Sequence, residues 1–151
     1  MTLREKAIKT IEAAFDGKAD KGGAPYTNHL LMVASKFESD DVLYISALLH
    51  DIVEDCENWS VDIIEREFGY DVARIVDSLT RRHGEGYTDY IFRVCGNERA
   101  IPIKLADLQD NMDLTRIKTN LSKSDLFRVQ KYHNAYLLLR RQVLVNNLMH
   151  Q

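Results

Sequence analysis

Residues 42–56 read VLYISALLHDIVEDC, and this stretch decides the fold. Successive residues of an α-helix are about 100° apart, so apolar side chains point in nearly every direction over residues 42–53. A helix that is apolar all round is buried in a core. The stretch therefore predicts a central, buried helix that Asp40 or Asp41 caps and that ends near Asp55.

Four polar side chains crowd the last turn of this predicted helix. They are His50, Asp51, Glu54 and Asp55. On a helical wheel they fall within one arc of about 140°. Buried carboxylates are costly unless a cation or hydrogen-bond donors compensate them. A metal site is one interpretation, and a helix end that emerges into water is the other; these residues alone leave both open.

Composition narrows the class of protein. Gly and Pro number 7 + 2 = 9, too few for the frequent turns of a sandwich, barrel or propeller. The 45% hydrophobic content argues against disorder, and the length suits one domain, expected to span residues 1–151. A net charge of 20 − 23 = −3 gives no reason to expect a nucleic-acid partner. With two cysteines and no long apolar run, we expect a soluble, cytoplasmic protein without a membrane partner.

Apolar residues elsewhere also follow a helical period. Thr2 and Glu5 form a capping box at the first helix. Asn97 is expected to cap the seventh helix, in which Pro102 must stand near the start or produce a kink. The predicted helices cover about residues 2–15, 28–37, 40–55, 60–69, 72–79, 88–94, 97–112 and 124–149. The sequence thus predicts an all-α, single-domain bundle of about eight helices.

A second polar face lies on the seventh predicted helix. Residues 100–112 read AIPIKLADLQDNM, in which Lys104, Asp107 and Asn111 are spaced at i, i+3 and i+7. This spacing places the three side chains on one face, opposite an apolar face. The segment adds a fourth carboxylate, that of Asp107, to the candidate site.

A histidine completes the set. Residues 22–34 read GGAPYTNHLLMVA, and His29 stands in the first turn of an apolar helix, where a lone histidine is also compatible with simple core packing. Together with His50, Asp51 and Asp107 it supplies two imidazoles and two carboxylates. Such a set can bind a divalent ion and leave positions for water, so we expect a central metal site.

These segments carry a resemblance. DKGGAPYTNH (20–29), LLHDIVEDC (48–56) and IKLADLQDNMDL (103–114) match the H…HD…D pattern of the HD superfamily of metal-dependent phosphohydrolases. They most closely resemble the hydrolase domain of the RelA/SpoT family, which degrades guanosine tetra- and pentaphosphate alarmones. The similarity runs from about Ile8 to Arg140, so it implies an HD-type bundle and a small stand-alone hydrolase without the synthetase half.

The resemblance also implies a role for each matching residue. The metal ligands would be His29, His50, Asp51 and Asp107, and the single divalent ion would be manganese. The pair that orients or deprotonates the attacking water would be Glu54 and Asp55. The residues that contact the nucleotide would be Lys21, Lys104, Asn111 and Tyr132.

The implied reaction removes the 3′-pyrophosphate and gives GDP or GTP and pyrophosphate. Family members often have Arg-Lys before the Gly/Pro loop, where this chain has Asp20-Lys21. An acid cannot stack on a base as arginine does, so NADPH or a nucleoside phosphate stays open as a different substrate. Two further hypotheses are a non-catalytic HD domain that binds a nucleotide and a helical scaffold that binds no metal.

Two remaining features permit two interpretations each. Arg81, Arg82 and His83 form the densest basic patch, which could meet distal phosphates or be a solvated loop. The long last helix could form a homodimer interface, but core packing explains its apolar stripe equally well.

Overall fold

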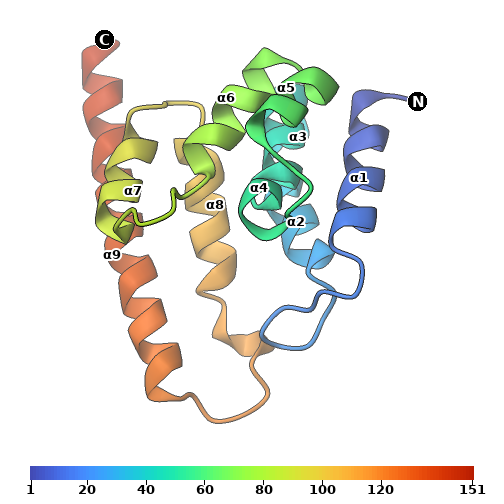
Figure 1. The fold of residues 1–151 in the computed structure, drawn as a ribbon. Helices are drawn as coiled ribbons and strands as arrows, with labels where there is room; N and C mark the ends of the chain where they lie inside the picture. Colours follow the sequence, from blue (N-terminus) through green and yellow to red (C-terminus); the bar gives the residue numbers. More distant parts are fainter.

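Helices account for the regular structure of this chain, whose computed structural model describes residues 1–151 (Figure 1). The α-helices are α1 (Leu3–Ala14), α2 (Thr27–Ala34), α3 (Asp41–Leu49), α4 (Ile52–Asp55), α5 (Val61–Phe68), α6 (Tyr70–Leu79), α7 (Tyr87–Cys95), α8 (Ile101–Asn111) and α9 (Lys123–Met149). Two 3-10 helices, η1 (Ser35–Phe37) and η2 (Leu114–Arg116), join them. The predicted all-α class is confirmed.

Four of the nine α-helices, α1, α3, α5 and α9, begin at a residue whose side chain caps them. The side chain of Thr2 accepts from the backbone N–H of Glu5, and Glu5 reaches back to Thr2. Ser122 and Asp125 form the same reciprocal box at α9, and Asp40 caps α3. Each cap satisfies backbone donors that the first turn leaves free, worth about 1 kcal/mol.

The prediction that Asn97 caps the seventh helix is wrong. Helix α8 begins at Ile101 and its N-cap is Ala100, so Pro102 stands in the first turn. A proline there lacks only an N–H that the helix does not use, and no kink results. The Asn97 amide instead donates to Ser78 Oγ at 3.0 Å.

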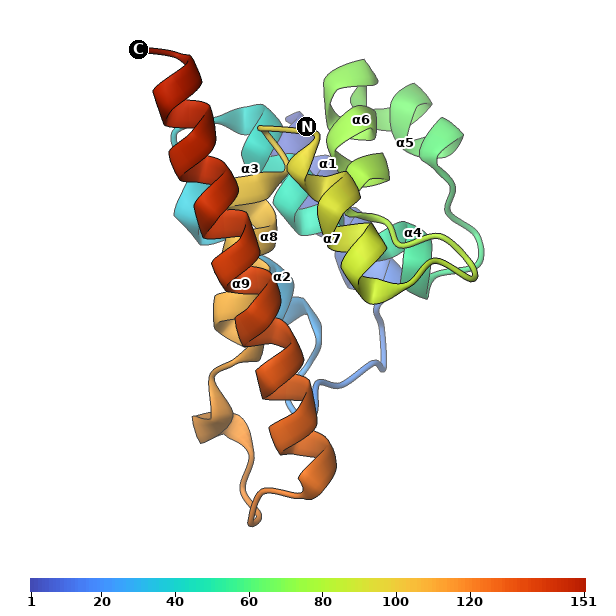
Figure 2. The same ribbon diagram turned by 90° about the vertical axis from the view of Figure 1, so that its left-hand side faces the viewer.

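Helix α3 lies at the centre of the bundle. Its residues 44–49 are all buried, and it contacts α1, α2, α6 and α8. Figure 1 shows α1 on one side of this centre and α8 and α9 on the other. Figure 2 shows α9 running along α8 with α7 beside it, and both neighbours contact α9. None of the helices combines the length and apolar character that a membrane span requires.

The expected continuous helix over residues 40–55 is interrupted, which corrects the prediction. Helix α3 ends at Leu49, α4 starts at Ile52, and between them Asp51 has φ −104° and ψ −3°. Adjacent residues of an unbroken helix point about 100° apart. The break lets His50 and Asp51 approach each other, with Nε2 and Oδ2 3.1 Å apart.

Gly69 provides a test of how the helices are joined. It links α5 to α6 with φ +95° and ψ 167°, and a Cβ there would meet no atom within 4 Å. Only glycine adopts this backbone readily, so Gly69→Ala should lower the free energy of unfolding by about 1–3 kcal/mol, measured by urea denaturation. Gly86→Ala is the matched control, because Gly86 has φ −64°. Equal midpoints for the two variants would contradict this account of the junction.

Candidate metal centre

Four predicted ligands converge on one point in the interior. Their ligand atoms, from His29, His50, Asp51 and Asp107, lie within 4.8 Å of one another. His29 comes from α2, Asp107 from α8, and the other two from the α3–α4 break. His29 and His50 are each 1% exposed and Asp107 is 3% exposed. The packing of α2, α3 and α8 therefore assembles a set whose members are up to 78 residues apart (107 − 29).

The imidazole nitrogens at this point suit a cation. His29 Nε2 lies 2.9 Å from Asp107 Oδ1, and His50 Nε2 lies 3.3 Å from the same oxygen. Neither Nε2 has a hydrogen-bond partner, although both are buried. Buried nitrogens that face carboxylates without hydrogen bonds fit a shared divalent ion, and this donor set suits a transition metal.

The opposite nitrogen of each ring fixes its orientation. His29 Nδ1 lies 2.5 Å from Asp110 Oδ2, and His50 Nδ1 lies 2.6 Å from the carbonyl oxygen of Ala47. With Nδ1 donating, Nε2 carries a lone pair toward the cluster. Burial lowers the pKa of both histidines, but the facing carboxylates outweigh it and raise the pKa of His29 to about 9. The centre thus favours positive charge, which a metal ion can supply in place of protons.

Lys104 and Asn111 both hydrogen-bond to Asp107. Lys104 Nζ donates to Oδ2 at 2.8 Å, and Asn111 Nδ2 donates to Oδ1 at 2.9 Å. Burial raises the pKa of Asp107, but Lys104 and the two histidines outweigh it, so the carboxyl pKa is held well below its ordinary value. The structure therefore places these two predicted nucleotide contacts on a predicted metal ligand, while both still line the cavity beside it.

The predicted acid pair lies at the rim of this centre. Glu54 and Asp55 are exposed and face the cavity, and Glu54 Oε1 accepts from the backbone N–H of Arg81. Partial burial in the cavity raises the pKa of both carboxyls, and the negative charge of Asp51 raises it further. A raised pKa suits a carboxylate that accepts a proton near neutral pH.

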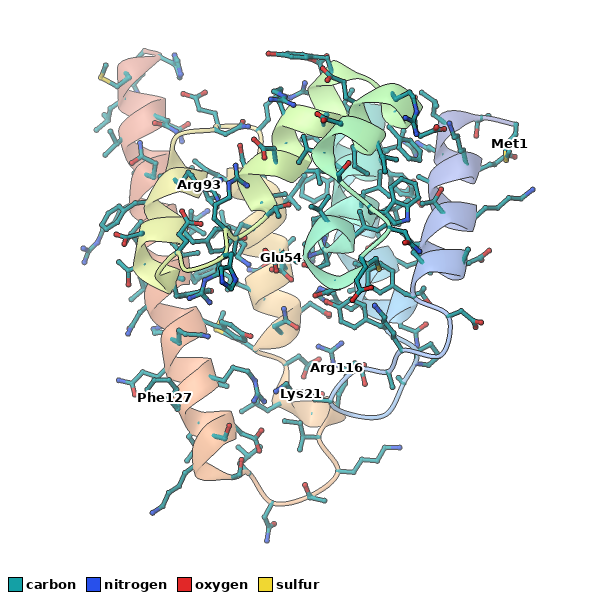
Figure 3. All side chains as sticks on the ribbon, viewed as in Figure 1. Met1, Lys21, Glu54, Arg93, Arg116 and Phe127 are labelled. Atoms are coloured by element: carbon teal, nitrogen blue, oxygen red, sulfur yellow. The ribbon has the colours of Figure 1, made fainter.

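A cavity of about 490 Å³ adjoins the cluster and is lined by both basic and acidic side chains. Its basic lining residues are Lys21, Arg81, Lys104, Arg116, Arg128 and Lys131. In Figure 3, Lys21 and Arg116 lie below Glu54, and all three line the cavity. Tyr132 lines it as well. Its volume is in the range of small-ligand sites, and its cations suit an anionic ligand.

The basic patch at residues 81–83 is divided. Arg81 lines the cavity, whereas Arg82 and His83 do not. Arg82 pairs with Asp77 at 2.9 Å and also donates to the Thr80 carbonyl at 2.9 Å. Only one of the three residues is therefore placed to meet a ligand in this cavity.

Asp20 closes its own loop. Its Oδ1 accepts from the backbone N–H groups of Gly22 and Ala24, both at 2.9 Å. Gly22 also packs against η2, where a Cβ would lie 2.5 Å from the Arg116 carbonyl oxygen. The acid at position 20 thus shapes the loop that carries Lys21.

Sequence reasoning missed two residues of the centre. Tyr26 Oη donates to Asp51 Oδ2 at 2.5 Å, and Asp110 contacts His29. Asp110 lies three residues after Asp107, so the i, i+3 spacing that grouped Lys104 with Asp107 could have found it. No local pattern marks Tyr26, because its partner lies on another helix.

Comparison with known proteins gives one family and a matching fold. The HD domain family matches residues 7–88, more than half of the chain. A solved structure described as a metazoan ortholog of SpoT that hydrolyses ppGpp has a TM-score of 0.69 and 24% identity, covering 98% of this chain and 97% of that one.

Curated relatives are much longer than this chain. A guanosine-3′,5′-bis(diphosphate) 3′-pyrophosphohydrolase of Borreliella burgdorferi is 31% identical over 121 residues, 71% of this chain and 18% of the relative. One of the same name from Aquifex aeolicus is 36% identical over 103 residues, 61% of this chain and 15% of the relative. A probable GTP pyrophosphokinase of Mycobacterium leprae is 27% identical over 128 residues, which are 77% of this chain and 16% of the relative. The chain spans less than a fifth of each relative.

Divalent metal should stabilise the folded protein. At 100 times the dissociation constant, a ligand specific to the folded state adds about 2.7 kcal/mol, so Mn²⁺ should raise the melting temperature and a chelator should reverse it. Asp51→Asn keeps the shape of the side chain but removes its charge, and should abolish most of the rise seen by calorimetry. Asp62→Asn, an exposed change in α5, should keep it. If Mn²⁺ leaves the melting temperature of the wild-type protein unchanged, the proposed metal site is wrong.

Proposed function

Because this chain belongs to the HD domain family, we propose that it is a metal-dependent hydrolase of guanosine tetra- and pentaphosphate. It would release the 3′-pyrophosphate and leave GDP or GTP. The observation that carries this proposal is the placement of a buried His/Asp cluster and an exposed acid pair beside a cavity that basic side chains also line. The names of the relatives from B. burgdorferi and A. aeolicus support the substrate.

The ion would be held by His29, His50, Asp51 and Asp107, and we propose that it is Mn²⁺. When bound, such an ion lowers the pKa of a water and polarises a phosphoryl oxygen. Tyr26 orients Asp51 and Lys104 neutralises Asp107, so the protein supplies ligands whose positions are fixed before the ion arrives.

The acid pair would deprotonate the attacking water. Glu54 or Asp55 accepts its proton, and the water oxygen attacks the phosphorus that is attached to the 3′ oxygen. The bond between that phosphorus and the 3′ oxygen breaks, so pyrophosphate is released and the 3′ oxygen takes up a proton to become the hydroxyl of GDP or GTP. The backbone N–H of Arg81 holds Glu54 Oε1, which leaves the other carboxylate oxygen available.

Cations of the cavity would bind the phosphates. Lys131 makes no salt bridge and lies 4.5 Å from the centre of the Tyr87 ring and 5.5 Å from that of Tyr132. Burial lowers its pKa, and the neighbouring charges of Arg81, Lys104 and Arg128 lower it further. A lysine that no carboxylate pairs, beside other cations, favours an anionic group such as a phosphate of the substrate.

A different nucleotide substrate is the second candidate. Asp20 Oδ1 accepts both of its hydrogen bonds from its own loop, so this side chain is not placed to hold guanine as an arginine would. NADPH or a nucleoside phosphate therefore stays a candidate. In either case we propose a nucleotide hydrolase of the cytoplasm, acting in alarmone signalling if guanosine tetraphosphate is the substrate.

A nucleotide panel tests the proposal. With Mn²⁺ present, wild-type protein should release pyrophosphate from guanosine tetraphosphate faster than it degrades NADPH or nucleoside monophosphates. Asp51→Ala should lose metal binding and turnover together, and Asp62→Ala should lose neither. Phosphate release from NADPH, with none of the other nucleotides degraded, would identify NADPH as the substrate in place of guanosine tetraphosphate. No hydrolysis of any nucleotide would favour a non-catalytic HD domain.

Separate changes at the rim identify the general base. Glu54→Gln and Asp55→Asn leave the four ligands intact, so Mn²⁺ affinity measured by calorimetry should stay within about twofold of wild type. The variant that removes the base should lose about 10²–10⁴-fold in kcat. Wild-type kcat in both variants would exclude the acid pair from proton transfer.

A further inference from the structure

Two acids of α8 contact opposite nitrogens of the same histidine ring. Asp107 Oδ1 lies 2.9 Å from His29 Nε2, and Asp110 Oδ2 lies 2.5 Å from His29 Nδ1. The two acids are three residues apart, one turn of the helix. Asp110 is therefore not among the four converging ligands, and its carboxylate meets the side of His29 that faces away from them.

His29 depends on this side chain for its orientation. For His50, the carbonyl of Ala47, three residues earlier, receives Nδ1 at 2.6 Å. The corresponding carbonyl for His29 is that of Tyr26, which already accepts from the backbone N–H of His29 at 3.0 Å. The main chain provides Nδ1 of His50 with a partner, whereas Nδ1 of His29 has one only through Asp110.

Arg116 in turn holds Asp110. Its Nη1 lies 3.0 Å from Asp110 Oδ2, and its Nη2 donates to the Asp110 main-chain carbonyl. The Arg116 side chain is thereby bound to the end of α8 at two points, and its own carbonyl packs against Gly22. These contacts connect the loop of Lys21 to a metal ligand through fixed groups.

We infer that Asp110, clamped by Arg116, is a positioning residue of the metal centre that keeps the proton of His29 on Nδ1 and aims Nε2 at the ion. This inference rests on the proposed metal-dependent function and assigns Asp110 no contact with ion or nucleotide. A carboxylate can only accept a hydrogen bond from a neutral ring, so it selects the one tautomer that can ligate through Nε2.

Metal titration without nucleotide tests the inference. Isothermal calorimetry with Mn²⁺ compares wild type with Asp110→Asn, whose amide can donate to Nδ1 and favour the wrong tautomer. We expect the affinity to fall about 10–100-fold, as for other residues that orient metal ligands. Asp71→Asn, an exposed acid in the first turn of α6, is the matched control and should keep wild-type affinity. An Asp110→Asn affinity within twofold of that control overturns the inference.

Arg116→Ala keeps the test decisive if Asp110→Asn does not fold. It leaves the carboxylate but removes the clamp, so the Mn²⁺ affinity should fall about threefold or more relative to Arg66→Ala, an exposed arginine of α5. Urea unfolding without metal separates this loss from a general loss of stability. Equal affinities in the two arginine variants overturn the inference.

The outcome is independent of the substrate. Wild-type protein that binds Mn²⁺ but hydrolyses no nucleotide would overturn the proposed function and leave the expected affinity difference measurable. Nucleotide hydrolysis by the wild type, together with equal Mn²⁺ affinities in all variants, would support the proposed function and overturn the role of Asp110. A folded wild-type protein that binds no metal overturns both.

Discussion

The burial of four charged or polar ligands at one point is the constraint on which this structure depends. His29, His50 and Asp107 are almost completely inaccessible to solvent, and Asp51 completes the group. Carboxylates and imidazoles removed from water are costly to bury without compensating charge. The buried carboxylates therefore need positive charge close by, which Lys104 of α8 supplies to Asp107. The packing of α2, α3 and α8 brings these groups together.

Charge compensation separates the ligands from the reactive groups. The acids of α8 each have a cation, since Lys104 pairs with Asp107 and Arg116 with Asp110. Glu54 and Asp55 have no such ion pair and keep raised carboxyl pKa values at the rim. The two acids of α8 are thus held ionised by cations, and the acids at the rim are left able to exchange a proton. The same residue type serves two roles because its surroundings differ.

Local sequence patterns predicted that the chain is helical and which kinds of side chain form the candidate site, but they did not predict every helix boundary. The apolar run at 42–49 predicted a buried helix, and residues 44–49 are buried. The four residues that converge in the structure could be predicted because each stands at a helical spacing or a helix end that can be recognised within a few residues. The break after Leu49 and the start of α8 at Ile101 were not found, because neighbouring helices decide where a marginal turn ends.

By itself, the sequence determined an all-helical chain and predicted that two imidazoles and two carboxylates form a metal site. Only the tertiary structure decided how those ligands are held. His29 meets Asp110 across 81 residues, and Tyr26 meets Asp51 across 25. The tertiary structure also directs the Asp20 carboxylate toward backbone N–H groups of its own loop. It brings Lys104 and Asn111 into hydrogen-bond contact with Asp107. Periodicity reports which face of one helix is apolar, whereas the partner of a polar side chain depends on which helices pack together.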